Sequence, residues 1–517
     1  MSQTPDGADP AGKTRAHVTS RDVARGAGSA TLARLGALIE VVSQPAYTWM
    51  FGLATYGLYT VLWSLVNMLS NVLDLAMTSA LQRVVPQADG EERAHAVVKM
   101  ALLLGVLPSL AVAAGIIVCA EPLSGLLNVA PADAGDLVLS VRIFALALPL
   151  WSLVEVVTSA VRARRAFGPE IRLRLFWEQV TRLGLAAGLF LAGLHSIGLM
   201  VAHVASLTLT AGLGVRLLGR YYRLELLWAA PLDRAAAREL LRSGLAILPA
   251  NIIRRCFSDL PPVLLNLMLP GAAGATAAGL YGIARKVSSV AQSIRIAFGY
   301  VLAPLASHQS TLDRAGIQPL YGFAVRLSTL LVVPLATVTI LLADEILRLF
   351  APEAHAARDL LIVLTVARAL EAVAGPSNAI QEVIGRRVLP AVNSVVGLAL
   401  WLLAAALLVP RLGALGMGLA VAVGMVVSSY LSVFQLIMSD SLRPFAPPFG
   451  RTALAAAMVA LVLASLSSLL SSLPDPAQAT VLVVAWLAGT WLALRLGLAR
   501  EDVAALGRLG AVLRLRR

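Results

Sequence analysis

The chain has 517 residues, of which 58% are hydrophobic and 14% charged, and its mean hydropathy is +0.80. This composition is too apolar for a soluble protein and too evenly apolar for a single anchored domain. The formal net charge of +13 requires no nucleic-acid partner, because membrane topology and anionic lipid headgroups account for most of it. The composition therefore predicts an all-α polytopic membrane protein.

Long apolar runs follow one another along most of the chain. Residues 1–30 are the exception: they are polar, contain Pro5 and Pro10, lack an apolar signal-peptide core, and are predicted to form a disordered tail. A helix needs about 20 apolar residues to span the hydrocarbon. We count fourteen such runs, which begin near Thr31, Tyr56, Val97, Leu137, Leu173, Ile197, Gly244, Ala278, Leu320, Ala357, Leu389, Leu412, Thr452 and Ala479.

The distribution of basic residues between these runs predicts the orientation. With the N-terminus inside, the tail and the even-numbered turns hold most of the 42 Lys and Arg residues, whereas the opposite turns hold only Arg348 and Arg411. Short loops rich in Lys and Arg stay in the cytoplasm. We therefore expect an even number of spans in a bacterial inner (cytoplasmic) membrane, with both termini cytoplasmic.

Two short sequence matches recur at an offset of 222 residues and indicate a duplication. Residues 57–59 and 279–281 both read Gly-Leu-Tyr and open long apolar runs, while Arg-Arg pairs at 164–165 and 386–387 close later ones. A third match, residues 197–199 against 415–417, has slipped to an offset of 218, as a loop deletion would cause. Because each copy holds six spans, an even number, the repeats should be parallel.

The duplication divides the chain into predicted domains. Spans thirteen and fourteen have no counterpart in the repeat and are expected to form an appended hairpin. The final segment places Val503, Leu506, Leu509 and Leu513 on one helical face, which suits a helix lying on the inner leaflet, with a frayed basic tail as the alternative. The predicted units are a cytoplasmic tail (1–30), an N-lobe (31–219), a cytoplasmic inter-lobe linker (220–242), a C-lobe (243–437), the hairpin (452–496) and a basic amphipathic cytoplasmic tail (497–517).

The pattern resembles the polysaccharide (O-antigen type) flippases of the multidrug/oligosaccharidyl-lipid/polysaccharide exporter superfamily. The resemblance covers roughly residues 30–440, is strongest over 51–86, and recurs over 277–307. It implies a V-shaped pair of six-helix lobes that alternately opens a central cavity to each side of the membrane. It also implies a polyprenyl-pyrophosphate-linked oligosaccharide as substrate, moved outward for surface polysaccharide or lipopolysaccharide biosynthesis. Fourteen spans fit the polysaccharide branch better than the drug exporters.

Polar residues at membrane depth are candidates for function, because an unpaired ionisable group there is costly. In the second span Ser64, Asn67, Asn71, Asp74 and Thr78 recur at helical spacing, so this face is predicted to line a cavity. Hydrogen bonding between helices of one lobe is the alternative interpretation. Asn67 and Asn71 are candidate substrate-binding residues.

Cationic residues concentrate in the second repeat. Arginine suits a pyrophosphate headgroup, because its planar fork makes bidentate bonds to phosphate oxygens and keeps its proton. Arg368 and Glu371, three residues apart, are spaced to pair, which leaves a purely structural role open. The candidate headgroup ligands are Arg254, Arg255, Arg285, Arg295 and Arg368.

Carboxylates are spread over the first repeat. Glu40 lies near the centre of its predicted helix without a local cation, and such an acid prefers to be protonated or to bind an ion. Glu40 and Asp74 are therefore predicted to couple transport to H+ or Na+. Glu178 is expected to pair with Arg182. His203 is expected to be a hydrogen-bonded packing residue, with a proton relay as the less favoured alternative.

Several functions remain open at this stage. A drug exporter of the same superfamily should have an acidic and aromatic cavity, and a membrane glycan polymerase or ligase typically needs a large outer loop, which this chain lacks. A scaffold in envelope assembly is a further alternative.

We expect no enzymatic activity, no cofactor and no metal, since no Cys/His cluster has metal-ligand spacing. Cys119 and Cys256 fall in or beside spans, so we expect no disulfide. Membrane lipids and polysaccharide biosynthesis enzymes are the other expected partners.

Overall fold

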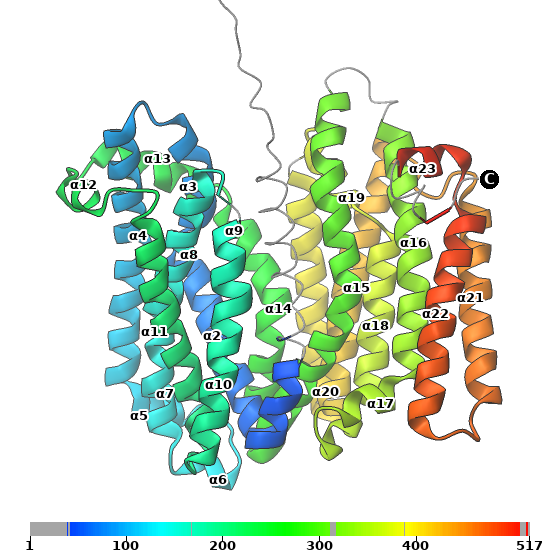
Figure 1. Ribbon diagram of the computed structural model, residues 1–517, viewed down its shortest axis with the longest axis horizontal. Helices are drawn as coiled ribbons and strands as arrows, with labels where there is room; N and C mark the ends of the chain where they lie inside the picture. The colour runs from blue at the N-terminus through cyan, green and yellow to red at the C-terminus, as the bar shows by residue number, and fades with distance from the viewer. Residues whose placement is uncertain are drawn as a thin grey trace, which may run out of the picture.

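The computed structural model describes residue 39 and residues 42–166, 168–310, 317–386, 388–506 and 513–514, without the side chains of residues 175, 293–310, 383 and 505. Every regular element in this part of the chain is a helix. The helices form two bundles side by side, with the last two long helices on the outer flank of the second (Figure 1). Cys119 and Cys256 are free.

The first bundle begins with a helical segment over residues 42–51. Its other elements are α2 (Leu53–Leu73), α3 (Met77–Val84), η1 (Val85–Gln87), α4 (Glu91–Val118), α5 (Ala120–Ser124), α6 (Pro131–Ala134), α7 (Leu137–Ala145), α8 (Ala147–Ala163), α9 (Gly168–Glu170), the π-helix η2 (Ile171–Trp177), α10 (Glu178–Leu191) and α11 (Gly198–Leu218). Two short helices follow, α12 (Leu224–Ala229) and α13 (Arg234–Leu245).

The second bundle begins with α14, which carries three charged residues. Its elements are α14 (Leu248–Met268), α15 (Ala272–Ser310), α16 (Ile317–Leu341), α17 (Ala343–Arg348), η4 (Pro352–Ala357), α18 (Arg358–Val373), α19 (Ser377–Val383), α20 (Val388–Asp440), α21 (Phe449–Leu469), α22 (Asp475–Gly497) and α23 (Arg500–Ala505). We call the end of the molecule with α12 and α13 the linker end and the opposite end, with α6 and α17, the loop end (Figure 1).

Eight of the described helices are long and apolar enough to cross a membrane, or nine if α2 and α3, bent by 43°, form one span. The other predicted runs are helices that are shorter, more charged or only partly described. α20 contains two predicted runs and changes direction at Gly413, whose φ of 54° suits a residue without a Cβ. The chain is thus the predicted all-α multi-pass membrane protein.

The two bundles cross most closely at the pair of repeated Gly-Leu-Tyr sequences. A Cβ atom on Gly57 of α2 would lie 1.8 Å from the carbonyl oxygen of Ala275 in α15, and one on Gly279 would lie 2.7 Å from the carbonyl oxygen of Leu53. The backbones touch because neither position has a side chain. The two copies of the repeated Gly-Leu-Tyr sequence therefore contact each other where the bundles cross.

Further contacts join the bundles at the loop end. Asn128, between α5 and α6, exchanges hydrogen bonds with Asn266 of α14: its backbone N–H donates to Oδ1 (3.0 Å), its Nδ2 donates to the carbonyl oxygen (2.8 Å), and Asn266 Nδ2 donates back to the Asn128 carbonyl (2.6 Å). Thr48 donates to the carbonyl of Phe350 (2.5 Å) and Trp49 to that of Leu349 (2.9 Å). The loop end is therefore closed.

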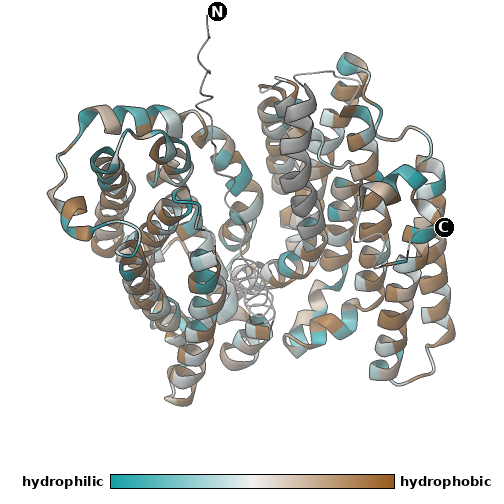
Figure 2. Cartoon of the chain, turned by 45° about the horizontal axis from the view of Figure 1, so that its top comes forward, coloured by the Kyte–Doolittle hydropathy of each residue, from teal (hydrophilic) through white to brown (hydrophobic). Residues whose placement is uncertain are grey.

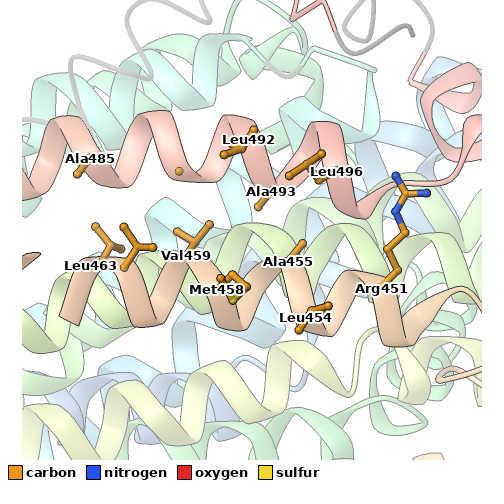
Figure 3. Close-up of a pocket in the computed structure, with 12 residues that line it drawn as sticks. Arg451, Leu454, Ala455, Met458, Val459, Leu463, Ala485, Leu492, Ala493 and Leu496 are labelled. Atoms are coloured by element: carbon orange, nitrogen blue, oxygen red, sulfur yellow. The ribbon is translucent and has the colours of Figure 1, made fainter. Parts of the chain in front are cut away.

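The helices α21 and α22 pack against α16 of the second bundle. The Thr452 hydroxyl donates to the Gly497 carbonyl (2.8 Å). Between the two helices lies an apolar groove of about 400 Å³, and Figure 3 shows its side chains, including Leu454, Met458 and Leu492, with Arg451 at one end. This groove has no charged partner for Arg451 among the described residues that line it.

The C-terminal segment differs from the predicted inner-leaflet helix. α23 spans only Arg500–Ala505, and Arg326 of α16 holds it by a bidentate ion pair with Asp502 (2.8 and 2.5 Å). Val503 and Leu506 pack on the apolar cluster around Leu330. Their face covers the protein, not a membrane surface, because the buried ion pair fixes the helix there. Leu509 lies outside the described residues.

Candidate substrate cavity

A cavity of about 760 Å³ lies between the bundles, in the half of the molecule toward the linker end. Its walls come from α2, α3, α14, α15, α18, α19 and α20. Figure 2, turned so that the linker end comes forward, shows the helices of the two bundles diverging in that direction. Because the loop end is closed, this cavity has the one-sided form that alternating access requires.

Arg254 and Arg255 of α14 both line the cavity but have different partners. Arg255 forms an ion pair with Asp259 one turn later (3.3 Å). Arg254 is exposed and donates to the side-chain oxygen of Asn251 (2.9 Å), an uncharged group. Among the described residues no carboxylate contacts Arg254, so its full charge is available to a ligand.

Asp259 also pairs with Arg285 of α15 (3.2 Å). The carboxylate is 4% exposed, and the Ser258 hydroxyl donates to it as well (3.0 Å). Arg285 additionally donates to the Ser258 carbonyl. Two guanidinium groups thus share one buried carboxylate, which leaves the cluster with one excess positive charge. Arg285 is not among the residues that line the cavity and acts on it through Asp259.

Arg368 and Glu371 of α18 line the cavity as the predicted ion pair (3.1 Å). Their side chains are 12% and 13% exposed. A neutral pair of this kind orients the guanidinium but contributes no net charge. The backbone of Arg295 lies in α15, but its side chain, like all of Glu40, is outside the described part of the chain.

The polar stripe of the second span lines the cavity only at its linker end. Asn71 and Thr78 are lining residues. Ser64 and Asn67 are 1% and 7% exposed and are not among the residues that line this cavity. This cavity therefore includes Asn71 and Thr78 but not Ser64 or Asn67, and a substrate-binding role for Asn67 stays a prediction.

Asp74 lies where the helix breaks. Leu75 and Ala76 adopt φ values of 49° and 56°, a left-handed conformation that residues with a Cβ rarely adopt. The Asp74 carboxylate accepts the N–H of Ala76 (2.9 Å) and is 5% exposed. No described cation lies within ion-pair distance of it. The break turns this carboxylate back onto its own backbone and away from the cavity wall.

Three further titratable residues of the first bundle, Glu155, Glu178 and His203, have partners. Glu155 accepts from Arg174 (2.7 Å), whose guanidinium also stacks on Trp151, and Glu178 pairs with Arg182 as expected. His203 is fully buried among aromatic rings, with Nδ1 2.9 Å from the Tyr59 hydroxyl. These contacts favour the packing interpretation of His203.

Several lining residues escaped the sequence reasoning. They are Asn378, Glu382, Ser394, Ser428 and Ser429. Serine and asparagine are common in membrane helices, so only spatial convergence distinguishes these from residues that bond neighbouring helices. Asn393, for example, donates to Ser432 (2.8 Å) and Gln435 (2.7 Å) inside the bundle and is not among the residues that line this cavity. Within the described residues, no group of three metal-binding side chains could hold an ion.

A family model described as polysaccharide biosynthesis protein matches residues 50–355, more than half of the chain. The chain belongs to the polysaccharide biosynthesis protein family. The family match contains the stripe of α2 and the arginines of α14 and α15, and it ends before Arg368. A search of curated proteins gives no match.

Solved structures share the fold. A lipid II flippase MurJ in an inward closed conformation superposes with a TM-score of 0.69 at 13% identity, over 92% of this chain and 99% of that one. An inward-facing multidrug resistance MATE transporter of the MOP superfamily gives 0.59 at 15% identity, over 80% and 94%. A single-residue mutant of the Vibrio cholerae MATE transporter VcmN gives 0.56 at 15%, over 80% and 99%. The family match confirms the polysaccharide biosynthesis family that the resemblance predicts, and these structures show that the chain shares the fold of MurJ and MATE transporters.

Proposed function

We propose that this protein flips a polyprenyl-pyrophosphate-linked oligosaccharide from the cytoplasmic to the outer leaflet of the bacterial inner membrane by alternating access. The observation that carries the proposal is the cavity: it is closed at one end, about 760 Å³ in volume, and contains the uncompensated charge of Arg254. The charge distribution of the loops supports a cytoplasmic linker end, with both termini on the same side.

The chemistry of the walls favours a glycan with an anionic headgroup. Arg254 and Arg255 supply fixed donors for phosphate oxygens in a partly desolvated site. The amides of Asn71 and Asn378 and the hydroxyls of Ser428 and Ser429 can donate and accept, as sugar hydroxyls require. Surface polysaccharide or lipopolysaccharide biosynthesis is the process such a substrate serves.

The multidrug exporter is the second candidate function. Organic cations call for a cavity with excess carboxylates and aromatic rings. Among the described lining residues, Phe257 is the one aromatic side chain, and Glu371 is already paired with Arg368. Glu382 remains exposed and is the observation that favours this alternative. A membrane glycan polymerase or ligase has less support, since the predicted outer loops are too short to hold a catalytic domain.

Charge reversal at Arg254 tests the headgroup site. We expect Arg254→Glu to reduce glycan export at least tenfold, about 1.4 kcal/mol in binding terms, because a carboxylate there repels pyrophosphate. Arg254→Lys should keep more activity than the reversal, because it keeps the charge but loses the fork. Arg411→Glu, an exposed reversal outside the cavity, is the control. Export is measured as glycan on the outer leaflet, alongside the amount of folded protein. Normal export by well-folded Arg254→Glu would contradict the proposal.

Ion coupling through the first bundle is the second part of the proposal. Asp74 is buried at a helix break without a cation partner, so uptake of H+ or Na+ would remove an unfavourable charge. Glu40 remains a predicted coupling residue from the sequence. Asp74→Asn and Glu40→Gln should insert normally but lose most of the dependence of export on an ion gradient. If both variants kept the wild-type response to collapse of that gradient, these residues would have no coupling role.

A further inference from the structure

The segment between the bundles, residues 216–242, exposes arginines without carboxylate partners. α13 buries Ala236, Leu240 and Gly244 against the first bundle and exposes the opposite face. That face carries Arg234, Arg238 and Arg242, spaced four residues apart, so their side chains form one stripe. Of the three acids in this segment, Glu239 pairs with Arg93 (3.2 Å), Asp233 caps α13 by accepting the N–H of Ala235 (2.7 Å), and Glu225 of α12 is exposed.

The same segment exposes large apolar side chains. Leu226, Trp228 and Leu232, in and just after α12, are 41%, 67% and 66% exposed. α12 lies beside α4 at the outer edge of the first bundle, whereas α13 crosses its end (Figure 1). Exposed leucine and tryptophan beside a basic stripe are typical of a surface that lies at a membrane–water interface.

Lys99 of α4 fixes the depth of α12. Its Nζ donates to the carbonyl oxygens of Trp228 (2.7 Å) and Ala230 (2.6 Å). Lys99 is the last charged residue of α4: residues 100–118 carry none and extend for about 28 Å, close to the thickness of the hydrocarbon core. The end of α12 is therefore held at the level where the hydrocarbon begins, which is the depth that tryptophan prefers.

We propose that α12, α13 and the residues flanking them form a docking surface for anionic phospholipid headgroups of the leaflet at the linker end. Leu226, Trp228 and Leu232 enter the interface, and Arg220, Arg223 and the α13 stripe bind headgroup phosphates. None of the described cavity-lining residues belongs to 216–242, so this surface is separate from the substrate cavity.

The surface connects directly to the substrate-binding helix. α13 ends at Leu245 and α14 begins at Leu248, six residues before Arg254. Gly244 also touches the break in the second span, where a Cβ would lie 2.2 Å from the Leu75 carbonyl oxygen. Lipid bound to α13 therefore holds one end of α14 at the membrane surface.

Spin labels in the full-length protein test the proposal. Cys119 and Cys256 are replaced by serine, and a label is attached at Leu232→Cys or, as the matched control, at exposed Ala235→Cys on α13. The protein is reconstituted in phosphatidylcholine with or without phosphatidylglycerol. We expect the label at 232 to be several-fold more accessible to oxygen than to a water-soluble nickel chelate, and phosphatidylglycerol to increase this ratio. The label at 235 should favour the nickel chelate in both lipids.

Charge removal separates the basic stripe from the apolar anchor. With Arg234, Arg238 and Arg242 all changed to Gln, the label at 232 should lose its response to phosphatidylglycerol but keep its preference for oxygen. Arg358→Gln at the loop end, where Arg358 pairs with Asp344, is the charge control. Equal nickel access at 232 and 235, or a wild-type protein indifferent to phosphatidylglycerol, would overturn the proposal. The proposal would also be overturned if inorganic pyrophosphate, added in pure phosphatidylcholine, changed the accessibility ratio of the label at 232 as much as phosphatidylglycerol does.

Discussion

At the scale of single residues, Asp259 determines how Arg255 and Arg285 are held. The spacing along α14 predicts its contact with Arg255, but the contact with Arg285 comes from α15 and depends on how the two helices pack. A buried carboxylate between two guanidinium groups reduces their mutual repulsion. Its removal leaves two cations facing each other in a partly buried site.

We predict that Asp259→Asn lowers the free energy of unfolding in detergent by about 1–3 kcal/mol, the cost of leaving charged partners unsatisfied. The arginines are 38% and 27% exposed, so water screens part of the repulsion. Thermal unfolding followed by size-exclusion chromatography measures the effect. Asp359→Asn, whose carboxylate is 72% exposed beside Arg358, is the control and should change little. Equal stability of the two variants would assign Asp259 no structural role.

The residue scale also shows why the polar stripe of the second span was only partly predicted. Helical periodicity places Asn67, Asn71 and Asp74 on one face of a continuous helix. The chain leaves the helix after Leu73 and reverses the sign of φ at Leu75 and Ala76, neither of which is glycine. Propensity gives no sign of such a break, because the contact that stabilises it, Gly244 of α13 on the Leu75 carbonyl, comes from a helix far along the chain.

At the scale of elements, apolar length and the repeat predicted most of the helices. Each span needs only its own apolar residues, so a local signal suffices. Contacts between residues far apart in the sequence could not be predicted from such local signals. The pair Arg326 and Asp502 joins helices 176 residues apart, and no periodicity links them. The predicted lipid-facing role of Val503 and Leu506 was wrong for this reason.

The crossing of α2 and α15 yields a prediction for the repeated glycines. Gly57→Ala should destabilise the protein by about 1–3 kcal/mol, the usual cost of overpacking, because the new Cβ must displace the Ala275 backbone. Gly115→Ala in α4 is the control: nothing lies within 4 Å of its Cβ, and alanine is a better helix former by about 1 kcal/mol. Unfolding in a denaturant series compares them. A Gly57→Ala protein as stable as Gly115→Ala would contradict the close approach.

At the scale of the whole molecule, the structure is asymmetric along its long helices. The largest apolar cluster spans both bundles near the loop end and includes Tyr47, Leu265 and Tyr281. The polar cavity occupies the other half. A transporter that opens alternately must break the loop-end contacts and form new ones at the linker end, so the free energy of those contacts sets the population of the two states.

The reciprocal bonds between Asn128 and Asn266 give this argument a test. Asn128→Ala removes two side-chain hydrogen bonds, one to the Asn266 carbonyl and one from the Gly271 N–H (2.8 Å). At about 1 kcal/mol each, their loss should shift the equilibrium away from the loop-end-closed state by roughly tenfold or more. A cysteine at Ala391 in the cavity wall, with Cys119 and Cys256 replaced, reports the shift through its labelling by a membrane-impermeant reagent added at the linker end.

We expect that labelling to slow in Asn128→Ala, because the cavity spends less time open to the linker end. Gln478→Ala is the matched control: it lies at the same end, but its amide donates to Ser467 within the α21 and α22 hairpin and joins no bundles (3.1 Å). Labelling of the same cysteine by reagent added at the loop end should become faster as labelling from the linker end becomes slower. Unchanged access from both sides in Asn128→Ala would mean that the closure rests on the glycine crossing and the apolar cluster, and that these bonds do not set the balance between states.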